Sequence, residues 1–301
     1  MKSRDTFSSC HPTINFLYFA LVLLFTMCFD HPLARFVSLA GALCYDLYLN
    51  GRKAAGFTLK YMVPMLLLTA IINPAFSHEG VTILRYFPNG NPLTLESIFF
   101  GASAALMLVA VVLWFACYNT VMTSDKFVYL FGRVIPALSL VLSMTLRFVP
   151  KFRAQIHSVS EAQRCVGRDI SNGTVLQRIK NGVTILSIMV TWTLENGIET
   201  ADSMRGRGYG LPGRTAYSIY RFDERDRYAL LWLCFCGVTI IAAWIAKGFY
   251  WRWYPSVKFT PFLPIVVFFH LVYTALCFTP LAIDLYADYR WNKIQKGEVR
   301  S

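Results

Sequence analysis

Six long apolar runs constrain what this chain can fold into. A helix needs about 20 consecutive apolar residues to cross a bilayer, with a range of roughly 17–25. The runs are Ile14–Phe29, Leu33–Leu49, Tyr61–Phe76, Ile98–Val121, Tyr228–Ala246 and Phe262–Leu285. Charged residues are only 15% of the chain, whereas a soluble domain has about 25%. The sequence therefore predicts an all-α membrane protein with about six transmembrane helices.

A seventh apolar run, Phe127–Val149, is interrupted by Arg133 and Pro136 and has basic residues near both ends. If this run spans the membrane, one of its basic flanks lies outside. If it lies along the cytoplasmic face, both termini are cytoplasmic and only five of the 29 Lys and Arg residues lie outside. Because Lys and Arg concentrate in cytoplasmic loops, we favour the second arrangement, and the sequence leaves the first open.

The net charge of +12 has the same explanation. In a soluble protein it could indicate nucleic-acid binding, but in a membrane protein basic residues set the orientation. We therefore expect a lipid bilayer and no nucleic acid as partner, and a multi-pass location in the plasma membrane. Three regions follow: residues 1–126, a four-helix membrane region; residues 127–227, a cytoplasmic or interfacial helical region; and residues 228–301, a two-helix membrane region with a tail.

The middle region reads as two helices, Lys151–Cys165 and Thr174–Met204. Each ends in a basic, glycine-bearing element. The candidate contact residues are Arg164, Cys165, Val166, Gly167 and Arg168 in the first element, and Gly206, Arg207, Gly208 and Tyr209 in the second. Glycine lets the backbone turn sharply or approach a partner, and arginine offers a planar charged fork for carboxylates or phosphates. The residues alone leave two interpretations: a partner surface, or ordinary helix caps with solvated side chains.

Motifs for catalysis or cofactor binding are absent from the sequence. Gly208–Gly213 fits GxGxxG in form, but a dinucleotide site needs a strand before the motif and a helix after it. Here a helix ends and Pro212 follows. There is no GxxxxGK[ST], no HExxH and no CxxC. We therefore expect no catalytic residue, cofactor or metal ligand.

The stretch Glu195–Thr215 resembles the second signature of the transmembrane T component of energy-coupling factor (ECF) transporters, the EcfT/CbiQ family. The hallmark of that family is two Ala-Arg-Gly motifs, each at the end of a cytoplasmic coupling helix. The second maps onto Gly206-Arg207-Gly208, followed by Tyr209. The first maps onto Cys165-Val166-Gly167, where Val166 replaces the arginine and leaves the role of this motif open.

The resemblance implies a non-catalytic scaffold. It would join two cytoplasmic ABC-type ATPases, which hydrolyse ATP, to a membrane S component that binds a vitamin or metal ion. The two coupling helices would lie in grooves of the two ATPases. The transported substrate, and whether the S component is shared, cannot be read from this chain. The alternative is a self-contained secondary transporter or channel, for which His270 and Pro64 are the residues of interest, although no repeat symmetry accompanies them.

Overall fold

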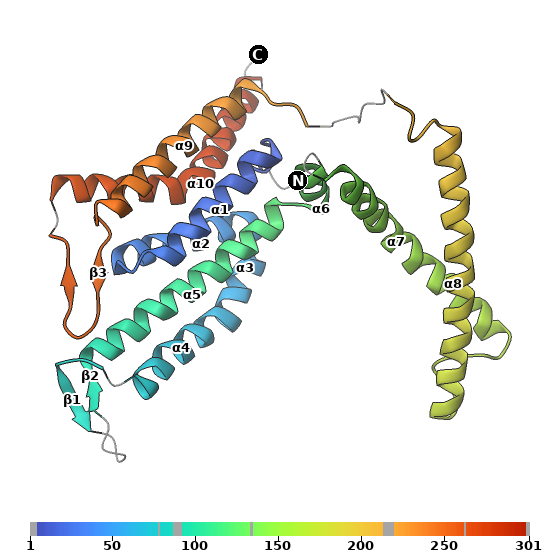
Figure 1. Ribbon diagram of the computed structural model, residues 1–301, viewed down its shortest axis with the longest axis horizontal. Helices are drawn as coiled ribbons and strands as arrows, with labels where there is room; N and C mark the ends of the chain where they lie inside the picture. The colour runs from blue at the N-terminus through green and yellow to red at the C-terminus, as the bar shows by residue number, and fades with distance from the viewer. Residues whose placement is uncertain are drawn as a thin grey trace. The chain divides into compact units, whose positions relative to one another are not determined.

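The structure, a computed structural model, describes residues 5–77, 79–86, 92–132, 135–212, 220–261 and 263–298. These residues are mostly helical, with two short antiparallel strand pairs (Figure 1). They divide into two compact units. The first combines Met1–Thr123 with Tyr220–Ser301, and the second is Ser124–Ile219. The predicted all-α membrane class is confirmed.

The N-terminal part of the first unit holds α1 (Pro12–Cys28), α2 (Pro32–Asn50), α3 (Arg52–Phe57), α4 (Val63–Phe76) and α5 (Leu95–Val121). A π-helical turn, Thr58–Met62, joins α3 to α4 without a break. The predicted start of this helix at Tyr61 was therefore wrong, because the basic residues after Gly51 begin the helix instead of lying in a loop. Between α4 and α5, β1 (Ile83–Tyr86) pairs with β2 (Pro92–Thr94).

The C-terminal part holds α9 (Glu224–Ile245), β3 (Trp251–Arg252), β4 (Lys258–Phe259) and α10 (Pro264–Glu298). The side chain of Asp223 caps the first turn of α9, and the Asp226 side chain accepts from the backbone N–H of Asp223 in return. This reciprocal capping satisfies donors that have no partner inside the helix. Helix α10 continues through Pro280 and past Leu285, so the predicted end of the last apolar helix was too early.

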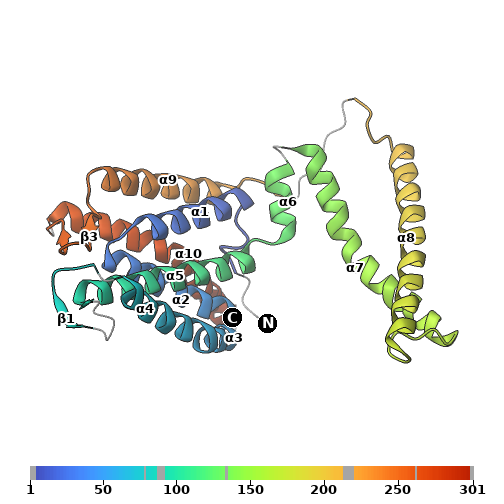
Figure 2. The same cartoon turned by 60° about the horizontal axis from the view of Figure 1, so that its bottom comes forward.

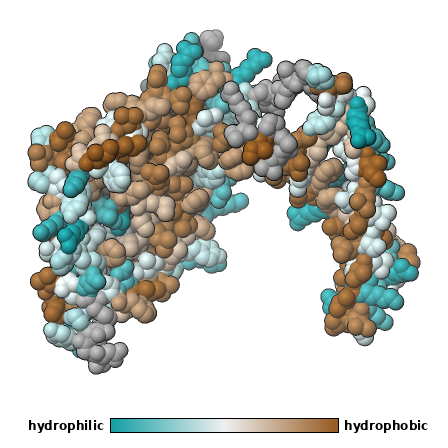
Figure 3. All heavy atoms as spheres, viewed as in Figure 1, coloured by the Kyte–Doolittle hydropathy of each residue, from teal (hydrophilic) through white to brown (hydrophobic). Residues whose placement is uncertain are grey.

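In the part of the chain that the structure describes, four helices are long and apolar enough to cross a membrane by length and composition. They are Arg52–Phe76, Leu95–Val121, Glu224–Ile245 and Pro264–Gln295. Helix α1 is apolar but has only 17 residues, and α2 carries the buried charged residues Arg35 and Asp46. Hydrophobic residues cover much of the visible face of this unit (Figure 3). The surface suits hydrocarbon as its solvent.

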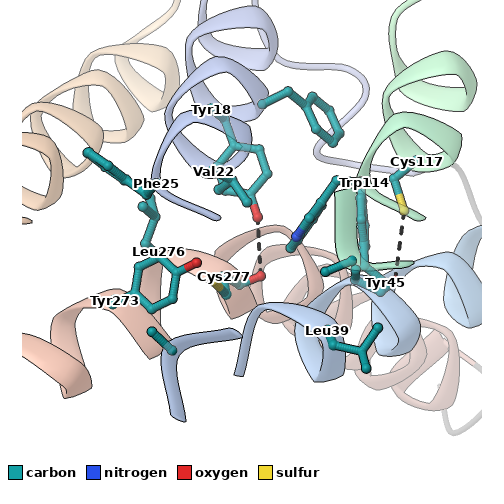
Figure 4. Close-up of a cluster of buried hydrophobic side chains, with 14 of the residues drawn as sticks. Tyr18, Val22, Phe25, Leu39, Tyr45, Trp114, Cys117, Tyr273, Leu276 and Cys277 are labelled. Atoms are coloured by element: carbon teal, nitrogen blue, oxygen red, sulfur yellow. Dashed lines mark hydrogen bonds between the residues drawn. The ribbon is translucent and has the colours of Figure 1, made fainter. Parts of the chain in front are cut away.

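Aromatic side chains from four helices meet in the core of the first unit (Figure 4). Tyr18 of α1 and Trp114 of α5 lie edge to face with ring centroids 6.0 Å apart. The hydroxyl of Tyr18 donates to the backbone carbonyl of Cys277 in α10 at 3.1 Å. Because both rings are fully buried, these contacts join α1 and α5 to α10.

Ser38 of α2 is the polar centre of the same core. Its hydroxyl oxygen accepts a hydrogen bond from Trp114 Nε1 at 2.9 Å and lies 2.6 Å from Thr26 Oγ1. The Thr26 hydroxyl oxygen lies 3.2 Å from the hydroxyl of Tyr273. Hydrogen bonds of this kind join helices where the surroundings offer no water. One small network therefore connects α1, α2, α5 and α10.

Further polar contacts hold α2 in place, from Arg35 within the helix and from the histidine before it. The buried guanidinium of Arg35 donates to Phe29 O at 3.0 Å, Ser103 Oγ at 2.7 Å and Asp30 Oδ1 at 2.6 Å. The sequence places His270 in an apolar run. In the fold its Nε2 atom lies 3.5 Å from Nδ1 of His31, the residue that precedes α2. His270 is therefore paired with a neighbouring element in the fold.

The second unit holds α6 (Ser124–Gly132), α7 (Pro136–Cys165) and α8 (Val175–Gly206) (Figures 1 and 2). The helix predicted at Thr174–Met204 is confirmed as α8. The start predicted for the first helix, Lys151, was wrong: α7 begins at Pro136 and contains Pro150. Helix α7 therefore contains most of the apolar run Phe127–Val149. Arg133, which interrupts that run, lies outside the described residues.

Candidate functional site

Helix α7 ends in a left-handed glycine turn. Gly167 has φ +78°, a conformation that glycine adopts without the cost borne by a residue with Cβ. The N–H of Gly167 donates to Arg164 O at 3.0 Å, and the N–H of Arg168 donates to Gln163 O at 2.9 Å. This pair of bonds is a Schellman motif, which satisfies the last carbonyls of a helix. Val166 is the C-cap residue.

Helix α8 ends in the same way. Gly208 has φ +74°, its N–H donates to Arg205 O at 2.9 Å, and the N–H of Tyr209 donates to Met204 O at 2.9 Å. Arg207 is the C-cap residue. The predicted end of this helix in its glycine-rich element is confirmed, and the backbone explains why a glycine stands at position 208.

The shared turn puts the residues of the two ends in register. The equivalent pairs are Arg164 with Arg205, Cys165 with Gly206, Val166 with Arg207, Gly167 with Gly208, and Arg168 with Tyr209. The backbone thus gives the same alignment as the two sequence motifs. Val166, with 69% of its surface exposed, stands where the second end presents a guanidinium.

The basic residues beside Val166 have different surroundings. Nε of Arg164 lies 3.6 Å from Oδ2 of Asp169, and 73% of the Arg164 side chain is exposed. Arg168 is exposed as well. The first end therefore has an apolar residue at its tip and two exposed guanidinium groups beside it. The second end has the guanidinium of Arg207 at the tip itself.

The loop after α7 is fixed to the start of α8. The pKa of the Asp169 carboxyl lies below its ordinary value of about 3.8. The main cause is the hydrogen bond from the Ser171 hydroxyl, followed by the one from the Ser171 N–H. Arg178 Nε donates to Ile170 O at 2.6 Å, and Asn181 Nδ2 donates to Asp169 O at 2.9 Å. This network was not predicted from the sequence, although Asp-x-Ser is a local signal for such a turn.

Side chains from both helices pack α8 against α7. Lys151 Nζ donates to Asn196 Oδ1 at 2.7 Å and lies 5.3 Å from the ring centroid of Trp192. The Trp192 ring also meets Phe152 edge to face at 5.7 Å. Ile185 and Met189 are the buried apolar residues of α8. These residues recur at helical spacing and form one face of α8.

A second apolar face of α8 is exposed. Its residues are between 52% and 82% exposed: Leu176, Ile179, Val183, Leu186, Val190, Leu194 and Ile198. Figure 3 shows hydrophobic residues along much of this helix. Isolated exposed apolar residues are common, but a continuous stripe of this length marks an interaction surface.

The two helix ends lie at opposite ends of α8. The loop from α7 leads directly into the first turn of α8, and the second end closes its last turn (Figures 1 and 2). A helix of 32 residues is roughly 48 Å long. The structure therefore presents two similar but separate sites.

These features define a membrane-embedded helical protein with a helical unit that carries two exposed, similar helix ends. Residues 9–217 match the family of the cobalt transport protein CbiQ. The match covers more than half of the chain, and the chain belongs to this family. The predicted resemblance is confirmed.

Curated relatives carry a consistent name. The chain is 33% identical over 108 residues to the energy-coupling factor transporter transmembrane protein EcfT of Lacticaseibacillus paracasei, a match that covers 36% of this chain and 39% of that protein. It is 25% identical over 189 residues to EcfT of Staphylococcus aureus (58% and 69%), and 25% identical over 177 residues to EcfT of Bacillus subtilis (56% and 67%). Against the Lacticaseibacillus protein, the match thus spans about two-fifths of the relative's length.

Proposed function

We propose that this chain is the transmembrane scaffold of an energy-coupling factor uptake transporter. It joins two ABC-type ATPases to a substrate-binding S component for a vitamin or metal ion, and it has no catalytic activity of its own. The observation that carries the proposal is the pair of Schellman ends with the same register on α7 and α8. Two similar contact elements on one unit suit two partner subunits.

The separation of the two ends supports two partner subunits instead of one. Roughly 48 Å of helix lies between them, so a single compact contact cannot engage both. Each end offers a backbone without Cβ at its turn and at least one exposed arginine. Such an end can enter an acidic or carbonyl-lined groove, because guanidinium forks form strong, directional hydrogen bonds there.

The exposed stripe of α8 suits the S component. The S component is a membrane protein, and an apolar face on α8 can pack against it without exposing either surface to water. Leu186→Glu should therefore weaken S-component association, and Ser187→Glu, which adds the same charge at the next exposed residue, should not. Equal association of both variants would remove the stripe from that interface.

The decisive test of the coupling role concerns Arg207. Truncating a charge-paired group at an interface typically costs about 2–5 kcal/mol of binding free energy. Arg207→Ala should leave insertion in the membrane unchanged and lower both the co-purified ATPase and substrate uptake. Arg207→Lys should recover only part of the loss, since lysine lacks the fork. Arg205→Ala is the matched control in the same turn of α8.

Two results would contradict the proposal. If the wild-type chain purifies alone and transports a substrate without ATPases, it is a self-contained transporter or channel. If Arg207→Ala matches the wild type in ATPase association and uptake, the α8 end is a helix cap and not the coupling element.

A further inference from the structure

An apolar groove lies between α9, α10 and the start of α1 in the first unit. Its volume is about 600 Å³, within the range of roughly 300–1,000 Å³ of small-molecule sites. Ala229 and Trp232 line it from α9, and Ala275, Phe278 and Ala282 line it from α10. The alanines on both helices leave the space that forms the groove.

The groove belongs to a lipid-facing surface. Both helices that line it are long and apolar enough to cross a membrane. Other apolar residues of the same two helices are exposed in the fold, with exposed fractions of 61% for Leu231, 52% for Phe235 and 63% for Leu271. In a bilayer these side chains contact acyl chains, and a groove on the same helices faces acyl chains as well.

One end of the groove is charged. Arg225, in the first turn of α9, is the charged residue among those that line it. Its Nη2 donates to Ser9 O at 3.3 Å, and a guanidinium has five donors, so this contact leaves capacity for a ligand. Tyr228 and Tyr286 are exposed near the same end, and tyrosine is typical of the headgroup level. The guanidinium therefore lies where lipid phosphates lie.

The length of the groove matches one leaflet. From Arg225 to Leu233, both of which line it, α9 advances roughly 12 Å. One leaflet contributes about half of the ~30 Å hydrocarbon core. A chain that enters beside Arg225 thus follows the groove to near the middle of the bilayer.

We propose that this groove binds one phospholipid of the leaflet in which α9 begins. One acyl chain lies between α9 and α10, and the phosphate is held by Arg225. The guanidinium fork matches phosphate geometry, and the apolar walls match the chain. This assignment is independent of the coupling role of α7 and α8.

The test uses the full chain in nanodiscs that contain a phosphatidylglycerol with a photoreactive diazirine in one acyl chain. Cross-linked peptides are then identified by mass spectrometry. We expect labelling concentrated on the groove residues of α9 and α10. Ala282→Trp, which fills the groove, should lower this labelling about tenfold, equivalent to about 1.4 kcal/mol. Ala242→Trp is the control, because Ala242 is an exposed residue of α9 outside the groove.

A second pair of variants tests the phosphate contact without filling the groove. Arg225→Gln should lower the labelling about tenfold, whereas Arg227→Gln, an exposed arginine of the same helix turn, should not change it. Uniform labelling of all exposed helix faces would overturn the proposal, and so would equal labelling in Arg225→Gln and Arg227→Gln. If a photoreactive residue at position 282 instead cross-links to another polypeptide in the assembled transporter, the groove is a protein interface and the lipid assignment is wrong.

Discussion

Two glycines two residues apart at the end of α8 should respond to alanine in opposite ways. Gly208 has φ +74°, and a Cβ there would meet Leu211 Cδ1 at 3.0 Å. Gly206 is the last residue of the helix, and a Cβ there would meet nothing within 4 Å. The same substitution therefore probes the turn at one position and the helix at the other.

The magnitudes follow from these two backbones. An L-residue in the left-handed region costs roughly 1–2 kcal/mol, and the contact with Leu211 adds little because its side chain can move. Alanine in a helix is favoured over glycine by up to about 1 kcal/mol. Gly208→Ala should thus lower the stability of this helix end by about 1–2 kcal/mol, whereas Gly206→Ala should leave its stability unchanged or raise it.

Hydrogen exchange of the peptide that covers residues 199–212 measures this difference. The reporting amides are those of Gly208 and Tyr209, which donate to Arg205 O and Met204 O. Gly208→Ala should speed their exchange by about tenfold, since 1.4 kcal/mol corresponds to that factor. Exchange in Gly206→Ala should be unchanged or slower.

Equal protection in the two variants would refute the reasoning, because the positive φ would then not hold the turn. If the turn presents Arg207 to an ATPase, Gly208→Ala should also lower ATPase co-purification, and Gly206→Ala, which restores the alanine of the family motif, should not.

Three other perturbations test other parts of the fold. Arg35→Met should lower the free energy of unfolding in detergent by about 2–4 kcal/mol. This is less than the cost of breaking a fully buried ion pair, because Asp30 is 57% exposed. Arg52→Met, at an exposed arginine, is the control, and equal thermal unfolding of the two variants would contradict this prediction. The pKa of Asp169 is lowered, so its carboxylate stabilises the loop above about pH 3.8, and this stabilisation is lost as the pH falls further. Hydrogen-exchange protection of residues 170–173 should therefore be constant from pH 7 to 5 and fall below about pH 4. In Asp169→Asn this fall should be absent. Val166→Asp should weaken ATPase binding by at least about 2 kcal/mol if the α7 end docks, since it buries an unpaired charge; an unchanged complex in this variant and in Arg164→Ala with Arg168→Ala would remove that end from the interface.

The sequence predicts most of what depends on local pattern. The apolar runs locate the helices of the first unit, and the helical spacing of apolar residues locates α8. The ends of α7 and α8 were also predictable, because glycine after basic residues is a helix stop with a known geometry. The start of α7 was not, because Pro150 and the change from apolar to polar residues at Lys151 both indicate a boundary, while the helix continues through them.

The contacts that hold the first unit together could not be predicted from local pattern. Thr26 and Tyr273 lie 247 residues apart in sequence, and His31 and His270 lie 239 apart. Nothing near either residue identifies its partner. The same holds for the groove at Arg225, because its walls come from helices at both ends of the chain. The apolar composition indicates that these helices lie in a membrane, but it does not indicate which helices pack against each other.

The two helix ends combine one backbone with two different tips. Both ends close with the glycine turn that many helices use, and its two hydrogen bonds satisfy the last carbonyls. The difference between the ends therefore lies in the side chains at the tips. The two ends share their register, which places residue 166 and residue 207 at the same point of the turn. A valine at one such point and an arginine at the other give the two ends different chemistry in the same geometry: an apolar tip flanked by Arg164 and Arg168, and a charged one at Arg207. On the proposed function, the two ends therefore offer the two ATPases different contacts: an apolar tip between two arginines at the α7 end, and a guanidinium at the tip of the α8 end.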